Sequence, residues 1–221
     1  MMIKTASKTI HEIFGVKESF KLPDEMMKIV LDKEKRETAM MRYLDEYTRD
    51  LSYDGFHEYY EEEQAERKKN KQDFTPDSIS DILSKIVGTS NSYYEPTAGT
   101  GGMLIRKWHQ DQMATSPFDY KPSNYLFFAE ELSDRALPFL IFNLAIRGIN
   151  AAVVHGDVLT REARGVFFIQ NDNDDFLGFS SVNIMPYSDE VKKYFGIQKW
   201  EGEKYEAHIE SELNTYGIFD I

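Results

Sequence analysis

The chain has no cysteine among its 221 residues. Without thiols it can form no disulfide bond, offer no thiolate to a zinc ion and use no cysteine nucleophile. Its five histidines are scattered, and none has a second histidine at the spacing of a metal site. We therefore expect neither thiol chemistry nor a bound metal.

A long apolar segment is also missing. No run approaches the roughly 20 residues of a membrane-spanning helix, and the first residues are too broken by polar side chains for a signal peptide. Hydrophobic residues make up 41% and charged residues 29% of the chain, which is the balance of a folded protein rather than a disordered one. We expect a cytoplasmic location and no membrane partner.

Positive charge is scarce. The 26 Lys and Arg residues are outnumbered by 38 Asp and Glu residues, which gives a net charge of −12. A protein that binds duplex DNA alone presents a basic surface, because phosphate contacts supply much of the affinity. The only dense basic cluster, residues 67–71, fits the solvated last turn of a helix. Any DNA contact is therefore expected to need a partner subunit, and a homo-oligomer stays open.

Residues 1–70 are expected to form a helical N-terminal domain. Apolar residues recur at helical spacing at Ile10, Ile13 and Phe14, and again over residues 26–30 and 40–44. Residues 55–69 are rich in Glu, Tyr and Lys and fit an exposed helix face, with a partner-binding face as the alternative. An acidic face that mimics DNA phosphates is the further alternative.

Residues 71–221 have a different pattern. A helix is expected to begin at Thr75-Pro76, with Thr75 as its N-cap, and to end at Gly88. Strands at 92–95, 125–130 and 151–155 then alternate with helices at 103–110 and 134–147. This order predicts an α/β fold, an incomplete parallel sheet flanked by helices, with ligands at the carboxyl ends of its strands. A polar loop at 170–175 and a charged helix at 203–213 are also expected.

The strongest motif follows the first of these strands and reads Glu95-Pro96-Thr97-Ala98-Gly99-Thr100-Gly101-Gly102. Its glycines let the backbone turn tightly and approach a ligand closely, and the next helix presents free N–H groups to an anion. The motif lacks the GK[ST] ending of a phosphate loop and the G-x-G-x-x-G spacing of a dinucleotide site.

In combination with three further motifs, this turn resembles the adenine-specific DNA methyltransferases, and most closely the modification subunit of type I restriction-modification systems. The further motifs lie in the order of that family and are Gln72-Asp73-Phe74-Thr75-Pro76, Ala129-Glu130-Glu131-Leu132 and His155-Gly156-Asp157-Val158-Leu159. A segment Asn143-Leu144-x-x-Arg147-Gly148-Ile149 resembles the family's Asn-Leu-x-x-His-Gly-Ile and supports the register. The likeness spans residues 70–190.

The resemblance implies a Rossmann-like fold that binds S-adenosylmethionine. Glu131 would hold the ribose hydroxyls, because a carboxylate at the end of the second strand can accept two hydrogen bonds. Asp157 would bind the adenine amino group of the donor. The full set of implied donor-binding residues is Phe74, Thr75, Pro76, Glu95, Pro96, Thr97, Gly99, Thr100, Gly101, Glu131 and Asp157.

The catalytic motif of the family is altered in this chain. The family has Asn-Pro-Pro-Tyr/Phe, in which the Asn side chain and a proline carbonyl accept the amino protons of a flipped adenine and the ring stacks on the base. This chain has Asn183-Ile184-Met185-Pro186-Tyr187. Pro186 and Tyr187 align and would hold the adenine, but Asn183 lies one residue too early, and side chains alternate between the two faces of a strand.

Two functions stay open from the sequence. The chain is either a DNA adenine methyltransferase that uses S-adenosylmethionine, with Asn183, Pro186 and Tyr187 as its catalytic set, or a catalytically inactive relative. An inactive relative would serve as a binding protein, such as an anti-restriction or nuclease-inhibiting protein of phage or mobile DNA. The family normally continues further beyond its catalytic motif, so a truncated form is a third expectation.

Overall fold

The computed structural model describes residues 6–57, 59, 88–116 and 119–212. Three α-helices open the chain, α1 (Ala6–Phe14), α2 (Leu22–Val30) and α3 (Lys33–Glu46), with a 3₁₀ turn, η1 (Ser19–Lys21), before α2. Most of the helix predicted to begin at Thr75 lies outside the described residues, as does most of the segment 55–69. No helix in the described part of the chain is long and apolar enough to span a membrane.

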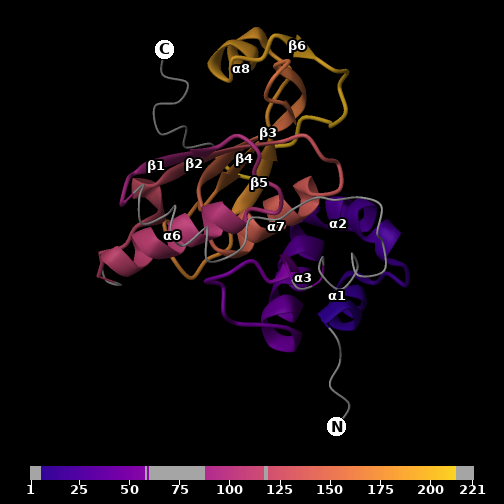
Figure 1. The fold of residues 1–221 in the computed structure, drawn as a ribbon, viewed down its shortest axis with the longest axis vertical. Coiled ribbons are helices and arrows are strands. Elements are labelled where there is room, and N and C mark those ends of the chain that lie inside the picture. Colours follow the sequence, from indigo (N-terminus) through magenta and orange to yellow (C-terminus); the bar gives the residue numbers. More distant parts are fainter. Residues whose placement is uncertain (1–5, 58, 60–87, 117–118, 213–221) are drawn as a thin grey trace.

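The three helices pack on the α/β part of the chain rather than standing apart from it (Figure 1). The ring of Phe142 on α7 (Leu137–Ile146) lies 5.3 Å from the ring of Phe14 and 5.6 Å from that of Tyr43. Burial of these aromatic side chains makes one continuous hydrophobic core from the N-terminal helices to the sheet.

The described residues form a sheet of six strands that is mostly parallel. Its strands are β1 (Ser92–Glu95), β2 (Leu126–Glu131), β3 (Ala151–Asp157), β4 (Glu162–Gln170), β5 (Ser181–Ile184) and β6 (Lys199–Trp200). The order is β1-β2-β3-β4-β5, with β6 beside β4. β1, β2 and β3 are parallel to one another, and α6 (Gly102–Ala114) and α7 connect them. This confirms the expected α/β fold and the positions of its first three strands.

The two faces of the sheet are covered by different helices. Side chains alternate along β3, so that Val153 packs with α6 and α7 in the larger core, while Ala152 and Val154 pack on the opposite face. The opposite face is covered in part by α8 (Asp189–Tyr194), through Val191. Helices on both faces are what a parallel sheet requires to bury its apolar strands.

Two features differ from the sequence prediction. β4 was not expected, and it runs antiparallel to both β3 and β5. The predicted helix over 203–213 is wrong for its described residues, because they form an extended segment in which His208 bridges Ile184. The helical spacing of charged residues there misled the prediction, since hydrogen bonds to β5 determine the conformation.

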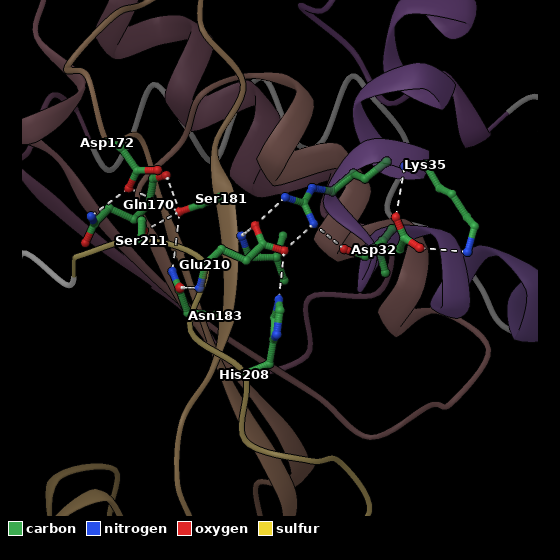
Figure 2. A network of polar contacts seen from close by, with 12 residues as sticks. Asp32, Lys35, Gln170, Asp172, Ser181, Asn183, His208, Glu210 and Ser211 are labelled. Atoms are coloured by element: carbon green, nitrogen blue, oxygen red, sulfur yellow. Dashed lines mark hydrogen bonds and ion pairs between the residues drawn. The ribbon is translucent and has the colours of Figure 1, made fainter.

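A buried ion pair connects the helices to this extended segment. The guanidinium of Arg36 on α3 donates to both carboxylate oxygens of Glu210, at 2.9 and 2.5 Å, and the two side chains are 1% and 3% exposed. Glu210 also accepts from the Val182 N–H at the start of β5 (Figure 2). Burial alone would raise the pKa of Glu210, but Arg36 and these hydrogen bonds hold that pKa below its usual value.

We predict that Glu210→Gln lowers the free energy of unfolding by about 3 kcal/mol, because it leaves the Arg36 guanidinium buried without a counter-charge. Urea denaturation of the variant and the wild type would measure this difference. The double replacement Arg36→Met with Glu210→Met should cost less, since it removes both charges together. Equal stability of Glu210→Gln and wild type would contradict the prediction.

Candidate functional site

The glycine-rich turn connects the end of β1 to the beginning of α6. Gly99 and Gly101 adopt φ values of +58° and +96°, in the left-handed region that glycine favours. The Ala98 N–H donates to the carbonyl of Glu130 at 2.9 Å, and the Gly101 N–H closes the turn onto the Ala98 carbonyl at 2.8 Å. The turn is thereby fixed against the end of β2, and α6 directs its first N–H groups toward it.

Glu131, at the end of β2, meets this turn directly. Its carboxylate accepts the Gly99 N–H at 2.6 Å and the Ser133 N–H at 2.7 Å. Burial raises the pKa of Glu131, and the backbone N–H donors offset part of that rise. A carboxylate has about four acceptor positions, so these two bonds leave capacity for hydroxyl groups of a ligand.

The side of the turn that a ligand would approach is open. A Cβ atom built on Gly99 would meet no atom within 4 Å. A nucleoside with a ribose and a carboxylate tail needs hydroxyl acceptors, N–H donors and close access to the backbone, and Glu131, the start of α6 and Gly99 offer these three features. The residues present therefore fit S-adenosylmethionine.

The other expected donor-binding residues are only partly brought together. Pro96 and Thr97 are exposed on the turn, and Glu95 accepts a hydrogen bond from Tyr93 at 2.7 Å. Asp157 is half-exposed at the end of β3, where its carboxylate accepts the Leu159 N–H at 2.8 Å. Phe74, Thr75 and Pro76 lie outside the described residues.

Glu130 faces the other side of the sheet from Glu131. Its carboxylate accepts from the Tyr94 hydroxyl at 2.6 Å and pairs with the Arg161 guanidinium at 2.8 Å. There it borders a groove of about 300 Å³ with Phe128 and Phe195 in its walls. Glu130 is therefore no ribose ligand, and it provides a control for experiments on its neighbour.

The strand that leads to Met185-Pro186-Tyr187 lies far from this turn. In the classic doubly wound order 3-2-1-4-5-6, the fourth parallel strand lies beside the first. Here β4 pairs antiparallel with β3, and β5 pairs antiparallel with β4, so β5 runs in the same direction as β1. In the order of the sheet, β5 lies four positions from β1. At ~4.8 Å per strand spacing, roughly 19 Å separates the two strands. No described strand pairs with the free edge of β1.

Asn183 is fully buried, and both ends of its side-chain amide are hydrogen-bonded (Figure 2). Its side-chain oxygen accepts the Glu210 N–H at 2.8 Å, and its amide nitrogen donates to the Phe168 carbonyl at 3.1 Å. Because the side chain is 0% exposed, an adenine amino group cannot reach this oxygen in the folded chain.

Tyr187 is also held within the protein. Its hydroxyl donates to the Arg164 carbonyl at 2.7 Å and accepts the Tyr205 N–H at 3.0 Å, while its ring packs edge-on against Trp200. Pro186 beside it is exposed. The structure does not bring the expected catalytic residues to the glycine-rich turn.

A polar cluster at the carboxyl end of β3 was not foreseen. His155 is fully buried, with Nδ1 2.7 Å from the Tyr205 hydroxyl and Nε2 3.0 Å from Asp134. Lys204 and Arg164 also pair with Asp134. Burial lowers the pKa of His155 to about 4, despite the neighbouring Asp134 carboxylate. The imidazole is therefore neutral at pH 7, and the cluster ties the segment after β6 to β3.

These features define an α/β protein whose mostly parallel sheet is flanked by helices, with a glycine-rich turn after the first strand and an acidic residue at the end of the second. Residues 51–190 match the family model described as N-6 DNA Methylase, which is well over half of the chain. The chain therefore belongs to the N-6 DNA methylase family, as the sequence motifs indicated.

Two further comparisons complete this result. No curated protein matches the chain. Among solved structures it is similar to a protein from Vibrio vulnificus YJ016, described as a type I restriction enzyme modification subunit, with 17% identity and a TM-score of 0.40. The similarity covers 58% of this chain and 25% of that one, so this chain spans about a quarter of that protein's length.

We predict that His155 makes the protein less stable in acid. The imidazole of His155 binds a proton near pH 6.5 in the unfolded state and only near pH 4 in the folded state. The contribution of neutral His155 to the free energy of unfolding is therefore fully present above pH 6.5. It decreases as the pH falls toward 4, by up to about 3 kcal/mol. The variant His155→Gln, which does not titrate, should lose less stability between pH 7 and 4. Urea denaturation of both proteins at several pH values would measure this. The same pH dependence of the free energy of unfolding in wild type and variant would contradict the prediction.

Proposed function

We propose that this chain binds S-adenosylmethionine at the glycine-rich turn and serves DNA adenine methylation as a donor-binding protein. The observation that carries the proposal is the contact between the Gly99 N–H and the Glu131 carboxylate, which joins the turn of β1 to the end of β2. Membership in the N-6 DNA methylase family supports it. Bound S-adenosylmethionine supplies an electrophilic methyl group on its sulfonium sulfur.

The residues of the chain have distinct tasks in this proposal. The Glu131 carboxylate would accept the two ribose hydroxyls, and Asp157 would accept the adenine amino group of the donor. The first N–H groups of α6, beginning at Gly102, would bind the carboxylate of the methionine part. Thr75 and Pro76 would contact the same part, as the sequence resemblance implies.

Contact with DNA is proposed to depend on a partner subunit. The chain has a net charge of −12, which opposes binding to a polyanion. A partner with a basic surface would supply both the affinity and the recognition of a DNA sequence.

The second candidate function is that of a catalytically inactive binding protein, which transfers no methyl group by itself. The position of Asn183 favours it. The side chain of Asn183 is used within the fold, and its strand lies four positions from β1. A chain that binds the donor but cannot hold the acceptor base would act as a binding protein.

Calorimetric titration with S-adenosylmethionine and S-adenosylhomocysteine tests donor binding. We predict that wild type binds both and that Glu131→Ala weakens binding roughly 10- to 100-fold, because two hydroxyls lose a charged acceptor. Glu131→Gln should fall between the two. Glu130→Gln, whose side chain lies on the opposite face, is the matched control and should bind as wild type does. No binding of either ligand by wild type would refute the proposal.

Transfer of a labelled methyl group to adenine-containing DNA tests the second candidate function. We predict no transfer by the chain alone, and we predict that Asn183→Ala lowers the free energy of unfolding by about 1–3 kcal/mol, because it leaves buried partners unpaired. Transfer by wild type that is lost in a folded Asn183→Ala protein would establish Asn183 as catalytic instead.

A further inference from the structure

A carboxylate from the N-terminal part of the chain reaches the glycine-rich turn. Asp54 lies in the loop formed by residues 51–56 and is 6% exposed. One of its oxygens accepts the Thr100 hydroxyl at 2.5 Å. The other accepts from the side-chain amide of Asn143 on α7 at 2.9 Å and from the Phe56 N–H at 3.0 Å. Asp54 therefore connects three separate segments at one buried point.

The loop that carries Asp54 is held firmly from the α7 side. Arg147, one helical turn after Asn143, donates to the Leu51 carbonyl at 2.8 Å and to the Tyr53 carbonyl at 2.7 Å. It also donates to the Asn143 side-chain oxygen at 2.8 Å. Burial lowers the pKa of Arg147, and the Asp54 carboxylate is among the groups that oppose this shift.

The loop is held from the α3 side as well. The Tyr47 hydroxyl donates to the Gly55 carbonyl at 2.9 Å. A Cβ atom on Gly55 would lie 2.1 Å from the Tyr43 hydroxyl, so the chain can approach α3 this closely only with glycine here. Asp54 thus projects from a segment with little freedom to move.

Thr100 is the only non-glycine residue between Gly99 and the start of α6. Its hydroxyl is bonded to Asp54, and its carbonyl accepts the Asn143 side-chain amide at 2.8 Å. Glycines lose more conformational freedom on ordering than other residues do, so a turn that contains several of them needs external contacts to keep one shape. Asp54 and Asn143 supply such contacts to both the side chain and the backbone of Thr100.

We infer that Asp54 and Asn143 are positioning residues that preform the donor-binding turn and make donor affinity depend on the loop 51–56. This inference rests on the proposed function. Neither side chain touches the open side of the turn, because Asn143, Asp54 and Thr100 are all at least nine-tenths buried. They act through Thr100, which sets the direction of the Gly99 N–H toward Glu131.

The test compares two ways of breaking the contact with one matched control. Thr100→Val removes the hydroxyl at nearly constant volume, Thr100→Ser keeps it, and Asp54→Asn removes the carboxylate charge. Glu210→Gln alters an equally buried carboxylate that ties α3 to β5 without touching the turn. For each protein we would measure urea stability, affinity for S-adenosylhomocysteine, and hydrogen exchange of the Ala98, Gly99 and Gly101 amides without ligand.

We expect Thr100→Val and Asp54→Asn to bind about 10-fold more weakly and to exchange these three amides about 10-fold faster than wild type under conditions where the protein stays folded. Thr100→Ser should restore both properties. Glu210→Gln should lose stability but keep wild-type exchange in the turn and wild-type affinity.

Two results would overturn the inference. The first is wild-type exchange of the turn amides in Thr100→Val. The second is weaker binding of S-adenosylhomocysteine by Glu210→Gln, in proportion to its loss of stability. Any destabilising substitution would then weaken binding, and Asp54 would have no specific role in the turn. Absence of S-adenosylhomocysteine binding in wild type would refute the proposed function instead, and the exchange measurements would still decide whether Asp54 orders the turn.

Discussion

The hydrogen bond from the Gly99 N–H to the Glu131 carboxylate is the contact on which the candidate donor site depends. It joins the turn after β1 to the end of β2 and places a hydroxyl acceptor beside exposed backbone. A carboxylate that is buried this deeply needs N–H donors to remain charged, and the backbone of the turn provides one of them. The geometry of the turn and the charge of Glu131 therefore support each other.

The position of β5 limits what the candidate donor site can do. In a doubly wound sheet the fourth strand lies beside the first, and ligands bind at the carboxyl ends of these strands. The hairpin formed by β3 and β4 moves β5 to the far edge of the described sheet, where Asn183 bonds to Phe168 and Glu210. One antiparallel strand is thus sufficient to separate two motifs that the sequence places in the family's order.

Local patterns in the sequence predicted the glycine-rich turn and the elements around it well. The strand 92–95, the helix after it and the acidic end of β2 are confirmed, because glycine spacing and strand-helix alternation depend on neighbouring residues. β4 was missed because pairing between distant strands leaves no local signal. Asp54 was missed too, although Asn143 within the apolar helix α7 indicated a buried polar partner.

The two halves of the site differ in how their residues are held. Glu131 accepts backbone N–H groups of the adjacent turn and of Ser133, so its contact with Gly99 does not depend on which strand follows β3. Asn183 depends instead on which strand pairs with β1, and that choice involves the whole sheet. We therefore expect donor binding and methyl transfer to be separable in this chain, and each requires its own measurement.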